Sequence, residues 1–480
     1  MDWTAQFDEY LAHLAAGLGH ADRVAHLAGY CTGLMLPLAR KSVEPMAARL
    51  DPLHASARHQ ALHHFVAKAD WSDAELLRRV AQWVVPKMDF AAGGGFWLVD
   101  DTGFPKKGRH SVGVARQWCG ALGKQDNCQV AVSVSLACEQ ASLPVAWQLY
   151  LPEAWAADPE RRAKAGVPED IAFATKGEIA LAQLQALLAE GAPRHCVVAD
   201  AGYGTEAAFR ARLTEMGLPY MVGVGSSTGV WPPGVQPLPP KPYSGHGRRP
   251  VATRRTADRQ PMSVAGLAQS LPPEAFSTIT WRQGTNDALA GRFAALRVRH
   301  AGGLTAKQRL HPEQWLLIEW PQNKDEPRKY WLSTLPEATP LAELARVAHV
   351  RCRIERDYQD LKQDLGLGHY EGRGWRGFHH HASLAIAAYG FLVAQRLRGR
   401  SGNDTDTSTS KARVGEKISL ERRLPAVPED HVPRGAGAGA APQSELDHHA
   451  AAAAHQQPAQ RNGDVPVLRQ GHAAPTLVTQ

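Results

Sequence analysis

Three acidic residues, far apart in the sequence, have the types and positions expected of a divalent-metal site. Asp100 directly follows the apolar run FWLV, Asp200 follows HCVVA, and Glu355 lies in a helix-like segment. Taken singly, an Asp after a strand is a common turn residue. Brought together, three carboxylates are hard oxygen ligands that suit Mg²⁺ or Mn²⁺ with positions left open for water and phosphate. Two ions about 3.5–4 Å apart could clamp the attacking and leaving oxygens of a phosphoryl transfer.

Two basic residues share the segment of Glu355. Arg351 precedes it by four residues and Lys362 follows it by seven, so one helix face would hold all three. On such a face the acid could bind a metal ion while the flanking cations bind the phosphate that the metal ion activates. The alternative interpretation is an ordinary salt bridge on a helix surface.

Further basic clusters could contact a polyanion. Lys106 and Lys107, with Arg109 and Arg116, follow the first acid, where they could line a DNA path or decorate a solvated hairpin. The densest basic run lies in a segment rich in Pro and Gly, and it could contact phosphates or be a solvated loop. This run consists of Arg248, Arg249, Arg254, Arg255 and Arg259.

The periodicity of the chain predicts the elements that must position these residues. Apolar residues at helical spacing, and the capping box of Ser72 and Glu75, predict helices over 1–90. From Phe96 onward, three strand-like runs are followed by helix 178–190, strand HCVVA, helix 205–216 and strand PYMVGV. This order is typical of a ribonuclease-H-like fold, an antiparallel meander with two parallel strands added by right-handed crossovers.

The pattern divides the chain into five segments, and predicts an α/β protein. We expect a helical N-terminal domain, a ribonuclease-H-like core, a β-rich insertion, the helix of Glu355 with a closing helix, and a disordered tail. Their bounds are 1–90, 91–225, 226–338, 339–398 and 399–480.

Composition excludes several classes of protein. The 480 residues are 44% hydrophobic and 21% charged, which excludes a wholly disordered chain. No run approaches the ~18 apolar residues of a membrane span, and the acidic start is unlike a secretory signal. The six cysteines form no C-x-x-C pair, so we expect reduced thiols in a cytosolic protein. The net charge of +7 weakly favours a polyanionic partner.

Long stretches of the sequence resemble bacterial insertion-sequence transposases of the DDE superfamily-endonuclease type. They include WLVDDTGFPKKGRHSVGVARQWCGALGKQDNCQVAVSVSLA, VVADAGYG, WRQGT and IERDYQDLKQDLGLGHYEGRGWRGFHHHASL. The similar stretches cover most of 1–398. The resemblance implies a ribonuclease-H-like core with a β-strand insertion, and divalent-metal cleavage and strand transfer of DNA.

The resemblance also implies which residues form the site. The first family Asp falls on Asp100 or Asp101, the second on Asp200 and the Glu on Glu355. Consecutive strand residues point to opposite faces, and we favour Asp100 because it directly ends the apolar run. A Tyr-x2-Arg-x3-Glu-x6-Lys signature of related enzymes is kept except at its Tyr, where this chain has Ala348.

Some related enzymes stack a Trp of the insertion on an extruded base, a role that would fall on Trp281, although packing is the alternative. By the resemblance, the partners would be the terminal inverted repeats of an element and its target DNA, bound by a homodimer in the cytoplasm, at the nucleoid. Two rival hypotheses are a DNA-binding repressor that no longer cleaves and a glycoside hydrolase with paired carboxylates.

The composition of the tail generates a first prediction. The segment 399–480 has few large apolar residues, so it cannot bury enough surface to offset ~1–2 kcal/mol of backbone entropy per residue. A stop codon after Arg400 should therefore leave thermal melting and DNA cleavage unchanged, and limited proteolysis should trim the chain to about that point. A large loss of stability or cleavage in the truncated protein would show that the tail is functional.

Overall fold

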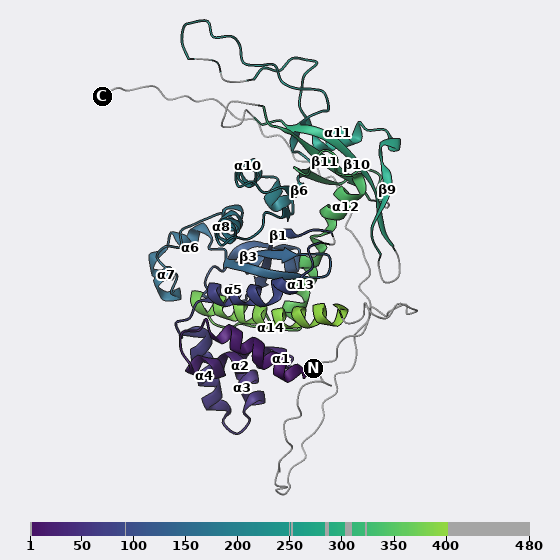
Figure 1. Cartoon of the computed structure of the whole chain (residues 1–480). Helices are drawn as coiled ribbons and strands as arrows, with labels where there is room; N and C mark the ends of the chain where they lie inside the picture. Colours follow the sequence, from purple (N-terminus) through teal and green to yellow (C-terminus); the bar gives the residue numbers. More distant parts are fainter. Residues whose placement is uncertain are drawn as a thin grey trace, which may run out of the picture. The chain divides into compact units, whose positions relative to one another are not determined.

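The computed structural model of the chain describes residues 2–91, 93–248, 250, 253–283, 288–302, 310–321 and 324–401. In these ranges the protein is mixed α/β, with N-terminal helices followed by a large mixed sheet (Figure 1). The predicted tail lies outside the described residues from 402 onward. No helix in the described ranges is long and apolar enough to cross a membrane, and no disulfide joins the six cysteines, all of which are described.

Five helices form the N-terminal part, as the periodicity predicted. The side chain of Asp2 caps the first helix, and Ser72 accepts a hydrogen bond from the backbone N–H of Glu75 at the start of the fifth. The predicted apolar stripe of the first helix is buried. The helices are α1 Trp3–Ala15, α2 Asp22–Met35, α3 Val43–Leu50, α4 Ala55–Ala67 and α5 Asp73–Val84.

The predicted meander with two added parallel strands is present. β3 pairs antiparallel with both β1 and β4, while β5 pairs parallel with β1, and β6 pairs parallel with β5. The short β2 extends the meander beside β3. The strands are β1 Phe96–Pro105, β2 Ala115–Cys119, β3 Lys124–Ala137, β4 Ser142–Leu149, β5 Cys196–Ala199 and β6 Tyr220–Val224.

Helices connect these strands. A capping box of Thr175 and Glu178 begins α8, close to the predicted helix 178–190. The helix predicted over 205–216 is present as α10, and a further short helix, α9, precedes it. The connecting helices are α6 Glu153–Ala156, α7 Pro159–Ala165, α8 Lys176–Ala189, α9 Ala201–Gly204 and α10 Ala207–Glu215.

The β-rich segment after β6 continues the same sheet. β12 pairs antiparallel with β6, and the order then runs through β11 to β10, whose far edge pairs with β9 at one end and with β7 at the other; β8 follows β7. The predicted strands of 226–338 are therefore present, and within the described residues they extend the core sheet. They are β7 Gly229–Trp231, β8 Met262–Ser263, β9 Ser277–Gln283, β10 Ala288–His300, β11 Glu313–Trp320 and β12 Lys329–Ser333, with α11 Val264–Gln269 between β8 and β9.

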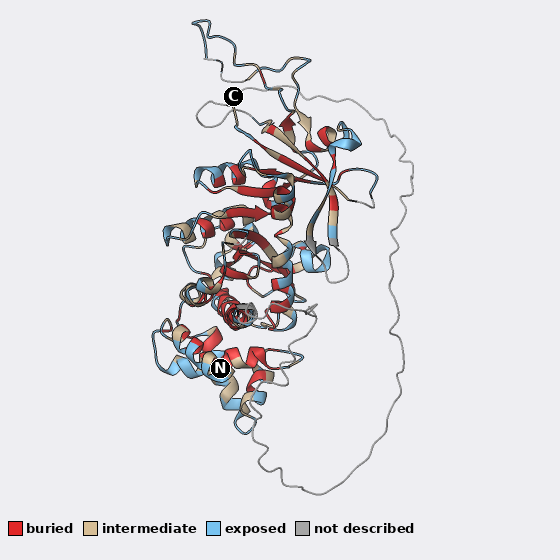
Figure 2. Ribbon diagram, turned by 45° about the vertical axis from the view of Figure 1, so that its right-hand side comes forward, coloured by how far each residue is buried: buried red, intermediate tan, exposed pale blue. Residues whose placement is uncertain are grey.

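Three helices, α12 Leu341–His349, α13 Cys352–Gln363 and α14 Trp375–Ser401, complete the described fold. The helix α14 lies between the sheet and the helices α1–α4, with α5 on its sheet side (Figure 1), and its residues are buried over most of its length (Figure 2). The ring of Phe391 packs against Trp3, Phe7 and Tyr10 of α1. The N-terminal helices and the sheet therefore share one apolar core.

Three consecutive histidines of α14 are buried in this core. The ring of His379 accepts a hydrogen bond from the backbone N–H of Leu149, and His380 stacks on Trp71. The ring of His381 shares a hydrogen bond with the hydroxyl of Tyr30 (2.9 Å) and lies 2.9 Å from the carbonyl oxygen of Gly366, to which it donates. These contacts give the histidine run a structural role, and burial lowers the pKa of His381 to about 4.

Acidification should destabilise the protein through His381. Its pKa is about 4 in the fold and 6.5 in the unfolded chain, so the unfolded chain takes up a proton first as the pH falls. The free energy of unfolding is therefore unaffected by this residue above pH 6.5 and decreases as the pH falls from 6.5 toward 4. His381→Gln keeps a donor and an acceptor but cannot titrate. Between pH 7 and pH 5 the variant should lose about 2 kcal/mol less unfolding free energy than the wild type, measured by denaturant titration.

His20→Gln, which makes the same substitution at an exposed position outside the core, is the matched control. Equal losses in the wild type and His381→Gln would show that His381 is not held neutral by the fold.

Candidate active site

The register of the parallel strands brings Asp100 and Asp200 together. The last paired residues of β1 and β5 are Val99 and Ala199, and the two aspartates come directly after them. The prediction that Asp100 ends its strand is wrong, because β1 runs on to Pro105 through its pairing with β3. What ends at this point is the parallel ladder.

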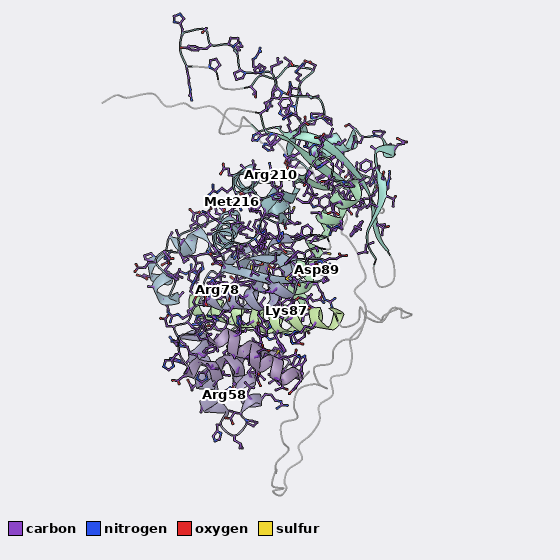
Figure 3. The ribbon with its side chains drawn as sticks, viewed as in Figure 1. Arg58, Arg78, Lys87, Asp89, Arg210 and Met216 are labelled. Atoms are coloured by element: carbon purple, nitrogen blue, oxygen red, sulfur yellow. The ribbon has the colours of Figure 1, made fainter. Side chains whose placement is uncertain are left out.

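The turn after Asp200 is held by close backbone packing. The Asp200 carboxylate accepts a hydrogen bond from the N–H of Gly202 (2.9 Å). A Cβ atom on Gly204 would stand 2.1 Å from the carbonyl oxygen of Gly223, so only glycine allows α9 to lie this close to β6. Arg210 of α10 (labelled in Figure 3) donates to the carbonyls of Gly204 and Thr205. This turn fixes Asp200 at the carboxyl end of β5.

Glu355 lies in the first turn of α13, and Arg351 lies just before that helix. The prediction of one continuous helix through this segment is wrong, since α12 ends at His349 and α13 begins at Cys352. Arg351 nevertheless has helical dihedral angles (φ −57°, ψ −25°), which keep it one turn before Glu355. Ala348, at the signature's Tyr position, is buried in α12.

The guanidinium of Arg351 contacts all three predicted metal-binding acids. Its Nη2 atom lies 3.2 Å from Asp100 Oδ1 and 3.6 Å from Asp200 Oδ2, and its Nη1 atom lies 3.4 Å from Glu355 Oε1. Acids from two strands and a helix, separated by up to 255 residues, therefore converge on one cation.

The two neighbouring aspartates differ in environment. Burial raises the pKa of Asp100 to about 7, against the lowering effect of Arg351. Asp101 lines the same cleft but pairs with Lys176 of α8 (2.8 Å), a partner that the sequence analysis missed. The capping box that starts α8 was the signal, because it fixes Lys176 at the first helical position.

A cleft of ≈ 570 Å³ surrounds these groups. Lys362 lines it and donates a hydrogen bond to the carbonyl of Gly103 (2.9 Å), which leaves further N–H donors on its ammonium group. Tyr203 and Tyr358, which the sequence analysis did not single out, also line the cleft. The hydroxyl of Tyr358 bonds Ser133 (2.6 Å), whereas the buried hydroxyl of Tyr203 has no partner among the described residues.

The donor set suits a divalent cation in kind, since three carboxylates already surround a positive group. Their oxygens are spread around the guanidinium, however, and the described residues contain no group of three His, Cys, Asp or Glu side chains close enough to hold a metal ion. Binding of one ion by all three acids therefore requires Arg351 to move from between them.

The other predicted DNA contacts are dispersed. Lys106 is partly buried and donates to the carbonyl of Tyr370 (3.0 Å), whereas Lys107 is exposed and lines a different cavity. Arg248 is exposed, and Arg249 lies outside the described residues. Trp281 stacks on His349, with 4.1 Å between ring centroids, and meets Phe293 edge-on, which favours the packing role over base stacking.

Comparison with known proteins identifies the family. The family described as "DDE superfamily endonuclease" matches residues 13–288, more than half of the chain. The chain belongs to the DDE superfamily endonucleases. Over 196 residues it is also 31% identical to the "Probable transposase for insertion sequence element IS701" of Microchaete diplosiphon. That match covers 41% of this chain and 47% of the relative, so the similarity spans about half the length of the curated protein.

The resemblance read from the sequence is thus confirmed, and this DDE endonuclease is a distant homologue of a transposase. Both Asp100 and Asp200 lie within the matched range, whereas Glu355 and Arg351 lie beyond it. Arg351 contacts both Asp100 in the matched range and Glu355 in α13, and so connects the two parts of the site.

The buried charge of Asp100 should weaken the fold. Its pKa is about 7 in the folded protein against 3.8 unfolded, so stability falls as pH rises through that interval. Asp100→Asn, which stays neutral, should be more stable than the wild type, by up to about 4 kcal/mol at pH 8 and by less at pH 5. Denaturant unfolding at both pH values measures the difference.

Asp101→Asn is the matched control. It removes a partly exposed pair with Lys176, worth ~0–1 kcal/mol, so it should be neutral or slightly destabilising. An Asp100→Asn variant no more stable than Asp101→Asn at pH 8 would contradict the charge assignment.

Proposed function

We propose that the protein is the transposase of an insertion sequence, which cleaves DNA at the ends of its element and joins them to target DNA. The observation that carries the proposal is the convergence of Asp100, Asp200 and Glu355 on Arg351 in a chain of the DDE endonuclease family. The strand order of β4, β3, β1, β5 and β6 supports a ribonuclease-H-like core, with β7–β12 as its insertion.

Each residue of the cleft would have a defined task. Asp100, Asp200 and Glu355 would hold Mg²⁺ or Mn²⁺, proposed as two ions, which would activate the attacking oxygen and stabilise the leaving one. Arg351 and Lys362 would bind the phosphate and its developing negative charge. A water molecule attacks the phosphodiester first, and the freed 3′-hydroxyl then attacks target DNA, so no covalent protein intermediate forms.

The proposed partners follow from this reaction. They are the terminal inverted repeats and the target DNA, bound by a homodimer in the cytoplasm, at the nucleoid. A repressor derived from a transposase is the alternative. The intact set of three acids favours the enzyme over the repressor.

Alanine variants of the three acids test the proposal. Asp100→Ala, Asp200→Ala and Glu355→Ala should each abolish Mg²⁺-dependent cleavage of labelled element ends, because each would remove a ligand of the same ions. Affinity for the DNA should stay near that of the wild type, since the phosphate-binding cations remain. Cleavage is followed on denaturing gels and binding by fluorescence anisotropy in EDTA.

Asp101→Ala is the internal control for this series. It should keep most of its cleavage, because Asp101 pairs with Lys176 and not with Arg351. A dead Asp101→Ala with an active Asp100→Ala would reverse the assignment. Wild-type protein that binds the ends but never cleaves them would support the repressor.

A further inference from the structure

A cavity outside the acidic cleft is lined by cations. It measures ≈ 470 Å³, and its lining includes Lys107, Arg109, Arg116, Arg161 and Asn127, with no acid among the described lining residues. A hollow lined by charges of one sign concentrates its field and attracts an ion of opposite charge. The cavity is therefore suited to an anion such as a backbone phosphate.

Two of its walls are fixed before any ligand arrives. The guanidinium of Arg161 lies over the ring of the buried Trp155, 3.8 Å from its centroid, and Trp155 in turn donates to the carbonyl of Val114 (2.8 Å). The amide of Asn127 donates to the carbonyls of Lys106 and Gly108, on either side of Lys107. A planar guanidinium held in place binds phosphate with less loss of entropy than a free one.

The strand β2 links this cavity to the acidic cleft. Arg116 lines the cavity, and Trp118, two residues further along, lines the cleft. Alternate residues of a strand share a face and lie about 7 Å apart. Both residues are exposed, and Trp118 has a relative accessibility of 56%, an unusual state for the largest apolar residue.

We propose that the exposed face of β2 binds one unpaired strand of DNA, with a base stacked on Trp118 and neighbouring phosphates held in the basic cavity. The inference rests on the proposed function and deepens it, because it names the form of DNA that enters the cleft. A flat indole beside cations matches a nucleotide, whose base stacks while its phosphate pairs with arginine.

The strand must be unpaired at this point. Within a duplex each base is covered on both faces by its neighbours, so an indole can stack on a base only where the helix is opened. The DNA near the scissile phosphate is therefore expected to be locally melted when bound.

Binding of short oligonucleotides tests the inference. The probes are a labelled ten-nucleotide single strand of DNA and an abasic strand of the same length, titrated with full-length protein in EDTA. Trp118→Ala should weaken binding of the normal strand roughly tenfold, as expected when one base no longer stacks, and leave the abasic strand unaffected. Trp118→Phe should restore most of the affinity, because it retains an aromatic face.

The cations should behave differently. Arg116→Ala and Arg161→Ala should weaken both strands alike, and each should reduce the log–log salt slope by roughly 0.7, because one phosphate would no longer be neutralised. Arg212→Ala, which removes the same charge from the exposed face of α10, is the control and should change neither strand.

The outcomes separate this inference from the proposed function. Unchanged affinity in Trp118→Ala, or an equal loss on the abasic strand, overturns the stacking site even if the wild type cleaves element ends in Mg²⁺. Stronger binding of an RNA strand with the same dependence on Trp118 overturns the assignment to DNA. A wild type that never cleaves refutes the transposase, whereas base-dependent binding through Trp118 would still support the strand site.

Discussion

The parallel pairing of β1 with β5 is the constraint on which the candidate site depends. Its register ends at Val99 and Ala199, and the next residue of each strand is an aspartate. Side chains alternate between the two faces of a sheet, so a slip of one residue would send one carboxylate to the opposite face. The buried apolar residues of both strands fix the register, and thus the relation of Asp100 to Asp200 is set by packing far from any ligand.

The charge arrangement that follows is unfavourable for the fold and useful for the chemistry. Three carboxylates in one cleft repel one another, and burial adds to the free energy needed to ionise Asp100. A single guanidinium offsets part of this repulsion by contacting all three acids. Under the proposed function, a divalent cation would offset this repulsion more strongly than one guanidinium does, so the arrangement would lower the stability of the fold in favour of the reaction.

Much of the architecture could be predicted because the signals are local. Capping residues, the valines of β3 and the acids that follow apolar runs all act within a few residues of their own positions. The role of Arg351 was underestimated, because the break between α12 and α13 and its contact with Asp100, 251 positions away, depend on tertiary packing.

The pairing of the strands after β6 and the exposure of Trp118 also depend on tertiary packing, which local sequence patterns do not reveal. An alternating pattern shows that a strand exists, but its partner is chosen by contacts distant in sequence, as when β12 joins β6. Trp118 has the residue type of a core position, and only the edge position of β2 leaves it exposed. Long-range pairing and exposure are properties of the assembled fold, which explains why local patterns did not reveal them.

The central position of α14 has a consequence for how the chain is made. Tyr10 donates a hydrogen bond to the carbonyl of Ala387, 377 positions later. A ribosome adding about 5–20 residues per second needs roughly 20–75 seconds to synthesise the intervening chain. During that time the apolar faces of α1, α2, α4 and α5 lack the helix that covers them. Until α14 has left the ribosome, these apolar faces remain open to aggregation and to binding by chaperones.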